Sequence, residues 1–153
     1  ATKVNSDKFL AGGAGGRIEL VNWDGTIEWE FTYLSDLYRH HHDVLEMPNG
    51  NILLLSWDAH NKEDAIASGR NPAYLGEMNE DVWSEHIVEV KPLPNNEYEI
   101  VWEWYLWDHL VQDFDATKAN YGVISEHPER VNVNFVARAT NNPDWIHRNA
   151  NHR

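Results

Sequence analysis

Two short segments carry the side chains best suited to chemistry. The first is His40-His41-His42-Asp43, at the start of a predicted strand, and the second is DWIHRNA at 144–150. A neutral imidazole can act as a nucleophile or a base, and imidazole and amide groups can donate hydrogen bonds to an anion. The two segments are therefore candidates for group transfer or anion binding.

The alternation of side chains along a strand decides which of these groups could act together. In a regular strand, His40 and His42 would share one face, and His41 would lie on the other with Asp43. A one-residue change of register would exchange the faces, so His41 remains the alternative to His42 as the histidine that faces a site. His147 and Asn149 are two residues apart and would also share a face.

Three predicted hairpins must position these segments. The histidines lead into a hairpin around Pro48-Asn49-Gly50-Asn51, where Asn-Gly predicts a type I′ turn because that turn needs positive φ at both central residues. A second hairpin spans 17–33 and turns at Asp24-Gly25, and a third spans 86–107 and turns within 92–96. Both flanking hairpins lie outside the histidine segment and would support it.

The remaining segments lack strand periodicity. Residues 58–84 and 108–130 are predicted to be surface excursions, with short helices near 62–68 and 108–114. The glycine run AGGAGG at 11–16 does not fit a nucleotide-binding motif and indicates a bend or a close backbone approach.

The hairpins at 17–33 and 86–107 repeat one pattern, a strand with Ile and Val, a turn, and a strand with I-x-W-E. The order is outer hairpin, histidine hairpin, outer hairpin, start of an inner strand. This order is typical of a β-propeller, in which the first strand of each four-stranded blade lines a central channel. The predicted fold is all-β, with 1–153 as a single partial propeller domain. It would comprise the second half of one blade, one full blade, an insertion and the start of the next.

Composition excludes several classes of function. The net charge of −13, from 25 acidic and 12 basic residues, argues against a nucleic-acid or anionic membrane partner. The absence of cysteine excludes disulfides, thiolate metal sites and cysteine nucleophiles. His40, His42 and His147 could together offer three imidazoles to zinc, copper or nickel, but no HExxH-like spacing supports this. We therefore predict no metal and no cofactor.

The segments HHDVLEMPNGNILLLSW at 41–57 and DWIHRNA at 144–150 resemble the bacterial arylsulfate sulfotransferase family, which are six-bladed propellers. That family has a His-Asp segment before a Pro-Asn-Gly-Asn turn, and an Asp-Trp-x-His-x-Asn-Ala motif. WEWYLWDHLVQDFD at 102–115 and HPERVNVNF at 127–135 are similar to the insertion before that motif. The resemblance runs from about residue 16 to residue 150.

The resemblance implies transfer of a sulfuryl group from a phenolic sulfate ester to a phenol, through a histidine and without a nucleotide sulfate donor. It implies that His42, His147 and Asn149 are catalytic, with sulfate binding and charge stabilisation by the last two. It implies that His41 and Asp43 bind substrate. It also implies a periplasmic or secreted protein. The alternatives are that His147 and Asn149 cap a loop and that the histidine run is a solvated strand end.

Family enzymes are several times longer, so the chain is expected to be a fragment of about two blades. The family's nucleophilic histidine and a sulfate-binding arginine are expected in a later blade, without a counterpart here. The expected partners are further blades or other copies that close a ring, because unpaired strand edges favour association. The alternative is a non-catalytic propeller fragment or self-assembling structural module, with metal binding through its histidines as an option.

Overall fold

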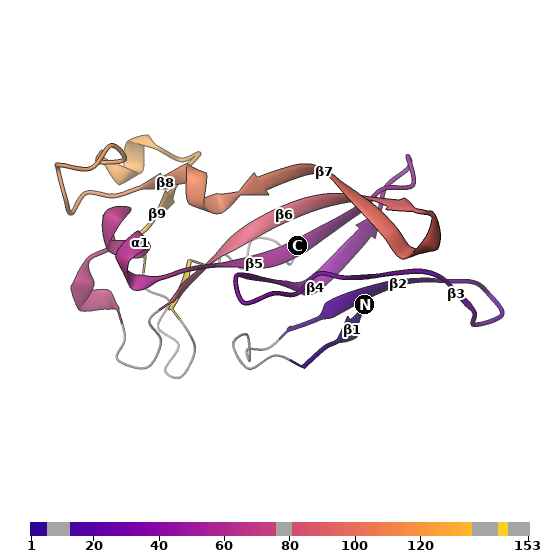
Figure 1. The fold of residues 1–153 in the computed structure, drawn as a ribbon. Helices are drawn as coiled ribbons and strands as arrows, with labels where there is room; N and C mark the ends of the chain where they lie inside the picture. Colours follow the sequence, from indigo (N-terminus) through magenta and orange to yellow (C-terminus); the bar gives the residue numbers. More distant parts are fainter. Residues whose placement is uncertain (6–12, 76–80, 136–143, 147–153) are drawn as a thin grey trace. The chain divides into compact units, whose positions relative to one another are not determined.

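The computed structural model describes residues 1–5, 13–75 and 81–135, and the backbone of 144–146 (Figure 1). The described residues form the strands β1 Thr2–Lys3, β2 Gly16–Val21, β3 Ile27–Thr32, β4 Tyr38–Glu46, β5 Ile52–His60, β6 Val82–Leu93, β7 Glu97–Tyr105, β8 Leu110–Val111, β9 Val131–Asn132 and β10 Asp144–Ile146. They also form the helix α1 Lys62–Ala67 and the 3₁₀ turns η1 Pro72–Tyr74, η2 Pro94–Asn96, η3 Leu106–His109 and η4 Ile124–Glu126. The chain is mostly β, as predicted, and none of the helices in these residues has the length and apolarity to span a membrane.

The strands form three sheets. One has the order β1-β2-β3, one has the order β10-β6-β5-β4 with β7 also paired to β6, and one joins β8 to β9. The β2–β3 and β4–β5 pairs are antiparallel, as the predicted hairpins require. Strands β4 to β7 are consecutive in the chain and each is hydrogen-bonded to the next. This order is the one expected for a propeller blade, and both the blade and the closed ring of blades stay predictions.

The turn between β4 and β5 differs from the predicted type. The Gly50 N–H donates to the Met47 carbonyl at 2.9 Å, and the Met47 N–H donates to the Asn51 carbonyl at 2.8 Å. Gly50 has a φ of 81°, but Asn49 is not among the residues with positive φ. The prediction of a type I′ turn was therefore wrong. The ring of Pro48 holds φ near −65°, which suits the first central position of a type I turn. The residue with the left-handed conformation is then Gly50, which follows the two central residues Pro48 and Asn49.

The β6–β7 turn is the one that has positive φ at both central residues. Asn95 has a φ of 63° and Asn96 a φ of 60°, and the Glu97 N–H donates to the Pro94 carbonyl. Asparagine tolerates this conformation better than most residues, so two asparagines suit a type I′ turn. The third predicted hairpin is confirmed, with its turn inside the expected range.

The chain divides into two compact units. Unit 1 comprises 1–58 and 86–104, and unit 2 comprises 59–85 and 105–153. The core of unit 1 consists of side chains that alternate along its strands: Ile18, Trp29, Phe31, Tyr33, Ile52, Leu54, Val88 and Val90. Burying each of these larger apolar side chains contributes about 1.5–3 kcal/mol. In the part of β6 that belongs to unit 1, the buried side chains are His86, Val88 and Val90.

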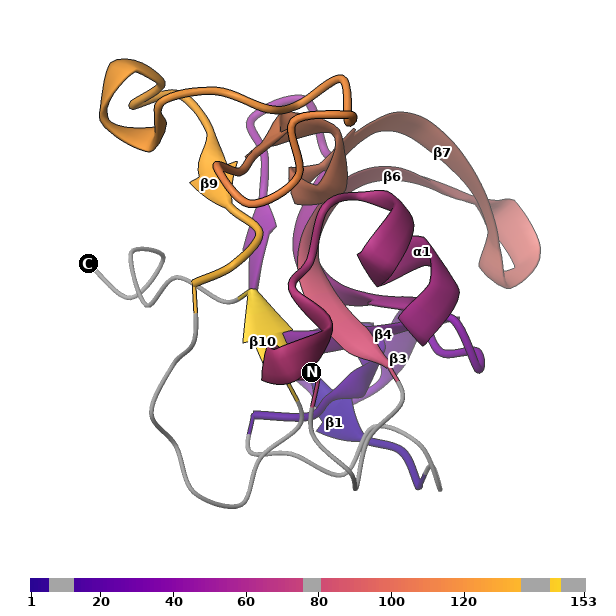
Figure 2. The ribbon, with the colours of Figure 1, turned by 90° about the vertical axis from the view of Figure 1, so that its left-hand side faces the viewer.

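Unit 2 is built from the two excursions, which fold against each other (Figure 2). α1 begins after the N-cap Asn61 and coincides with the helix expected near 62–68. The Asn120 side chain donates to the Ser68 carbonyl at 2.8 Å, and the Asn134 side chain donates to the Gly69 carbonyl at 3.0 Å. The helix expected at 108–114 is replaced by η3 and β8. The two segments therefore form one structured unit.

Candidate functional site

The histidine segment lies on β4, where the strand bulges. Between His40 and Val44, β4 advances four residues while its partner β5 advances only from Ser56 to Leu54. His42 has a φ of 55°, in the left-handed region that costs a residue with a Cβ about 1–2 kcal/mol. Regular alternation, on which the predicted faces depended, is therefore lost at His41, His42 and Asp43.

As a result, His41 and His42 contact each other instead of facing apart. Their Nδ1 atoms are 2.9 Å apart and their rings are perpendicular, with centroids 5.1 Å apart. His41 is only 1 % exposed, and its ring stacks on Trp57 of β5 at a centroid distance of 4.5 Å. His42 is exposed. The two histidines that the sequence left as alternatives form one hydrogen-bonded pair.

The glycine run before β2 makes room for the histidine rings. The His42 N–H donates to the Gly13 carbonyl at 2.8 Å, and the Gly15 N–H donates to the His40 carbonyl at 3.0 Å. A Cβ on Gly13 would lie 2.3 Å from Cε1 of His42, and a Cβ on Gly15 would lie 2.3 Å from Nδ1 of His40. The predicted close backbone approach is confirmed, and its target is the histidine strand.

His40 is separated from the exposed imidazole. It is 1 % exposed, and its Nδ1 accepts the Gly16 N–H at 3.3 Å. Burial, which disfavours the imidazolium, lowers the pKa of His40 to about 4. His40 is therefore neutral at pH 7 and has a structural place beside the glycines.

Two charged residues flank the histidines. The Arg39 guanidinium is fully buried and donates to the carbonyls of Val4 and Gly15, the latter at 2.9 Å. Burial lowers the pKa of Arg39. The exposed Asp43 carboxylate accepts the Val44 N–H at 2.9 Å. Arg39 thus holds the glycine segment against β4, and Asp43 shapes the bulge next to His42.

The second motif is described only at its start. The backbone of Asp144–Ile146 runs parallel to β6 and pairs with Val82 to Ser84. His147 and Asn149 lie outside the described residues, so their approach to His42 stays a prediction. Within the described ranges, no three His, Cys, Asp or Glu side chains gather in a way that could hold a metal ion.

A third buried histidine, which sequence reasoning did not select, lies on β6. His86 is 1 % exposed, and its Nε2 is 3.2 Å from the Glu103 carboxylate. Burial lowers the pKa of His86, against the raising effect of Glu103 and Asp58. These residues come from three strands, so only the sheet brings them together. Packing inside the sheet is sufficient to explain why His86 lies beside Glu103 and Asp58.

The tryptophans of the third hairpin have different environments. Trp102 on β7 is 47 % exposed. Trp107 stacks on His60 within unit 2, with ring centroids 3.6 Å apart.

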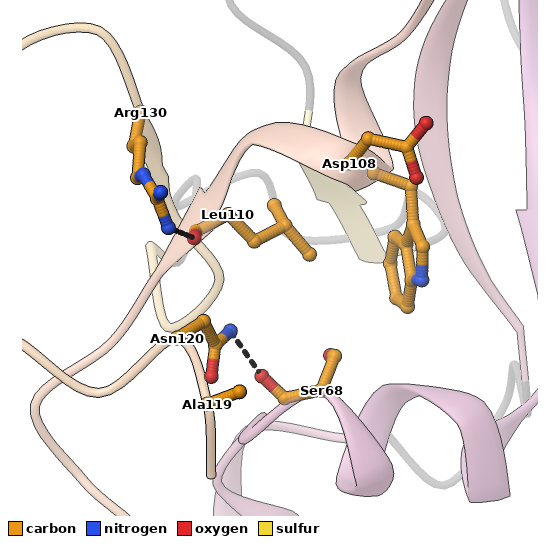
Figure 3. A pocket seen from close by; sticks show the side chains of 7 residues that line it. Ser68, Asp108, Leu110, Ala119, Asn120 and Arg130 are labelled. Atoms are coloured by element: carbon orange, nitrogen blue, oxygen red, sulfur yellow. Dashed lines mark hydrogen bonds between the residues drawn. The ribbon is translucent and has the colours of Figure 1, made fainter.

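A pocket of about 190 Å³ lies in unit 2 (Figure 3). Its lining comprises Ser68, Trp107, Asp108, Leu110, Ala119, Asn120 and Arg130. Figure 3 shows the Arg130 guanidinium directed at the Leu110 carbonyl, 3.3 Å away, and the Asn120 side chain bonded to Ser68. Because these polar groups already form hydrogen bonds within the protein, the pocket is a weaker candidate for a functional site than the histidine pair.

Comparison with known proteins agrees with the histidine motifs. The family model for arylsulfotransferase (ASST) matches residues 3–152, which include both the β4 histidines and the DWIHRNA segment. The chain matches no curated protein and no solved structure. The family match covers nearly the whole chain. The chain therefore belongs to the arylsulfotransferase (ASST) family.

Proposed function

We propose that the chain contributes to a site that transfers a sulfuryl group from a phenolic sulfate ester to a phenol through a histidine. The observation that best supports this is the pair formed by buried His41 and exposed His42, in the segment that resembles the family's His-Asp motif. An exposed imidazole with an oriented ring suits proton transfer or contact with a sulfate ester.

The proposed reaction has two halves. First, an imidazole nitrogen forms a bond to sulfur while the sulfur–oxygen bond to the donor's aryl group breaks and phenolate leaves. Then the acceptor phenol oxygen forms a bond to sulfur, the sulfur–nitrogen bond breaks, and a base takes the phenol proton. The reference pKa of a phenol is about 10, so this base matters at neutral pH. No cofactor is needed.

Within this scheme, His42, His147 and Asn149 are proposed to be catalytic. His147 and Asn149 would bind the sulfate oxygens and stabilise their charge, and Asp43 would contact substrate beside His42. His41 was assigned to substrate binding on resemblance, but its 1 % exposure favours a role through His42. The histidine that accepts the sulfuryl group and the arginine that holds the sulfate are proposed to come from further blades. A periplasmic or secreted location is part of the same proposal.

The test, made on the protein together with its further blades, is release of 4-nitrophenol from 4-nitrophenyl sulfate in the presence of a phenol acceptor. We expect His42→Ala, His147→Ala and Asn149→Ala each to lower the rate by about 10²-fold or more. His127→Ala is the matched control, because His127 is a surface histidine of unit 2 that pairs with Glu129. Transfer that survives all three substitutions at the control's rate would exclude these roles.

A second candidate is a non-catalytic, self-assembling propeller module. The observation that favours it is the row of exposed apolar side chains on one face of β7, at Tyr98, Ile100 and Trp102. Such a strand face favours association with another sheet. Light scattering after size exclusion measures the solution mass. A closed multimer without sulfuryl transfer would favour the module, and transfer by the assembled protein would favour the enzyme.

A further inference from the structure

The strand β4 changes its backbone partner at the histidines. It pairs with β5 on either side of a bulge at 41–43, and β5 does not match the bulged residues. There the segment 13–15 pairs with β4 instead, through an antiparallel bridge between Ala14 and His41. The glycine segment therefore takes up backbone groups that the bulge removes from the pairing with β5.

His42 is the residue of β4 that has a left-handed backbone, with a φ of 55°. Elsewhere in the described part of the chain, positive φ occurs at glycines and at the two asparagines of the β6–β7 turn. In this conformation the Cβ of His42 lies too close to the following carbonyl oxygen, so the surrounding structure must hold it. The Gly13 carbonyl contributes to this, because it accepts the His42 N–H at 2.8 Å.

The imidazole of His42 occupies the space that a side chain at position 13 would need. A Cβ on Gly13 would lie 2.3 Å from Cε1, 2.4 Å from Nε2 and 2.6 Å from Nδ1 of His42. The ring therefore lies directly against the Gly13 backbone. Gly13 also has a φ of 79°, which favours glycine. A residue with a Cβ at position 13 is thus incompatible with this orientation of His42.

We propose that Gly13 is a positioning residue for His42: its carbonyl holds the left-handed backbone, and its missing side chain leaves the space in which the imidazole lies. The bulge then brings His42 to the surface, while its neighbours His40 and His41 stay buried at 1 % exposure each. A ring with one orientation loses less conformational freedom when a substrate binds. That this substrate is an aryl sulfate or a phenol rests on the proposed function.

Two substitutions at His42 test the backbone conformation without any activity. His42→Gly and His42→Ala both remove the imidazole, so the loss of ring contacts is common to them. Alanine is more stable than glycine in a regular strand, whereas glycine is favoured in the left-handed conformation. We expect urea unfolding to give His42→Gly a folded-to-unfolded ratio about 3-fold or more above that of His42→Ala. A more stable His42→Ala chain would overturn the proposal.

A double-mutant cycle tests whether Gly13 acts through the His42 ring. Gly13→Ala should lower the folded-to-unfolded ratio about 5-fold or more further in the wild-type background than in a His42→Ala background, where its Cβ has no ring to meet. A Gly13→Ala chain that folds only when His42 is also replaced would equally support the proposal. An equal cost of Gly13→Ala in both backgrounds would overturn it.

Gly25→Ala is the matched control for this cycle. Gly25 also has a left-handed φ, of 87°, but a Cβ there meets nothing within 4 Å. Its substitution adds backbone strain without crowding a histidine, so its cost should be equal in the two backgrounds. A cost of Gly25→Ala that depends on His42 as strongly as that of Gly13→Ala would contradict a specific contact between Gly13 and the ring.

The orientation of the ring can also be observed in the wild-type protein. We expect nuclear Overhauser contacts between the His42 ring protons and the Gly13 α-protons, because the ring lies where a Gly13 side chain would stand. His42→Gln assigns the ring signals by their loss. The absence of these contacts would overturn the proposal, and the measurement needs no Gly13 variant to fold.

The transfer assay, on the protein together with its further blades, tests the consequence for the reaction. Gly13→Ala should lower kcat about 10-fold or more with KM nearly unchanged, and should have no further effect when His42 is already alanine. Gly25→Ala should leave kcat unchanged. An unchanged kcat in Gly13→Ala, or a further fall in the His42→Ala background, would overturn the role of Gly13 in transfer.

The two sets of measurements separate this proposal from the proposed function. Coupling between Gly13 and His42 in unfolding, without any sulfuryl transfer by the wild-type protein, would overturn the proposed function while supporting the positioning of His42 by Gly13. Sulfuryl transfer that needs His42, without such coupling, would support the proposed function and overturn the positioning.

Discussion

Both units contain an arginine that is almost completely buried, and the two arginines make the same kind of contact. Arg39 of unit 1 is 0 % exposed and Arg70 of unit 2 is 1 % exposed. Arg39 donates to the carbonyls of Val4 and Gly15, and Arg70 donates to those of Val133 and Phe135. Each guanidinium therefore joins backbone segments that are far apart in the sequence, and charge-assisted hydrogen bonds to carbonyls hold them together.

The difference between them is what each contact holds in place. Arg39 precedes the histidines on β4, and its acceptor Gly15 belongs to the segment that holds His42. Arg70 joins the excursion at 58–84 to the segment that follows β9, and none of the proposed site residues with described side chains lies in either. The stability of unit 1 and the geometry of the histidine pair are therefore coupled, whereas Arg70 serves the stability of unit 2.

The largest expected effects come from removing these arginines. Arg39→Met and Arg70→Met should each lower the free energy of unfolding by about 2–5 kcal/mol, because each leaves two carbonyls without their donor. Only Arg39→Met should also change the His42 NMR signals. Denaturant unfolding and the His42 spectrum measure the two effects. If Arg70→Met changed the His42 NMR signals as much as Arg39→Met does, the proposed difference between the two arginines would be wrong.

Acid should destabilise unit 1 through His40. Its pKa is about 4 in the folded chain and near 6.5 when unfolded, so the unfolded state binds more protons between these values. Stability is complete above pH 6.5 and is lost as the pH falls toward 4, by about 3 kcal/mol. His86, whose pKa is also lowered, adds a loss of the same sign.

The check on this acid effect is urea unfolding at pH 7, 5.5 and 4. His40→Gln should flatten part of the pH dependence and leave the part due to His86. As the pH falls, hydrogen exchange should show that β2 to β4 lose protection before unit 2 does. A wild-type stability that does not change between pH 7 and 4 would contradict the prediction for His40.

Glycine substitutions should separate backbone strain from crowding. Gly25→Ala places a side chain at a φ of 87° in open space and should cost about 1–2 kcal/mol. Gly13→Ala and Gly69→Ala should cost about 1–3 kcal/mol more, because their Cβ atoms would collide with His42 and Gln112 respectively. Thermal unfolding measures all three, and only Gly13→Ala should disturb the His41–His42 contact.

The smallest expected effect is in the β6–β7 turn. Asn96→Gly should stabilise the chain by about 0.5 kcal/mol, because glycine has no penalty at positive φ in a type I′ turn. Because this turn is remote from the histidine pair, the substitution shows how much the free energy of unfolding changes without any change at that pair. Denaturant unfolding measures the gain, and destabilisation would show that the Asn96 side chain's bond to the Glu30 N–H outweighs it.

Local chemistry explains which features could be predicted. The three hairpins follow from alternating apolar residues and from turns that involve few residues. The glycine run predicted a close approach, although not to which strand. The turn type at Pro48 was mispredicted because the Asn-Gly signal was weighted above the φ of proline. His147 and Asn149 remain predictions from the motif.

The sequence by itself determined the β-rich strand pattern, the position of each hairpin and the match to the arylsulfotransferase (ASST) family. Only the tertiary structure decided that His41 is buried against Trp57 and bonded to His42, and that Arg39 and Arg70 join distant segments. The reason is that strand periodicity and turn conformation are local, whereas a bulge and a buried guanidinium depend on backbone groups 24 to 65 residues away.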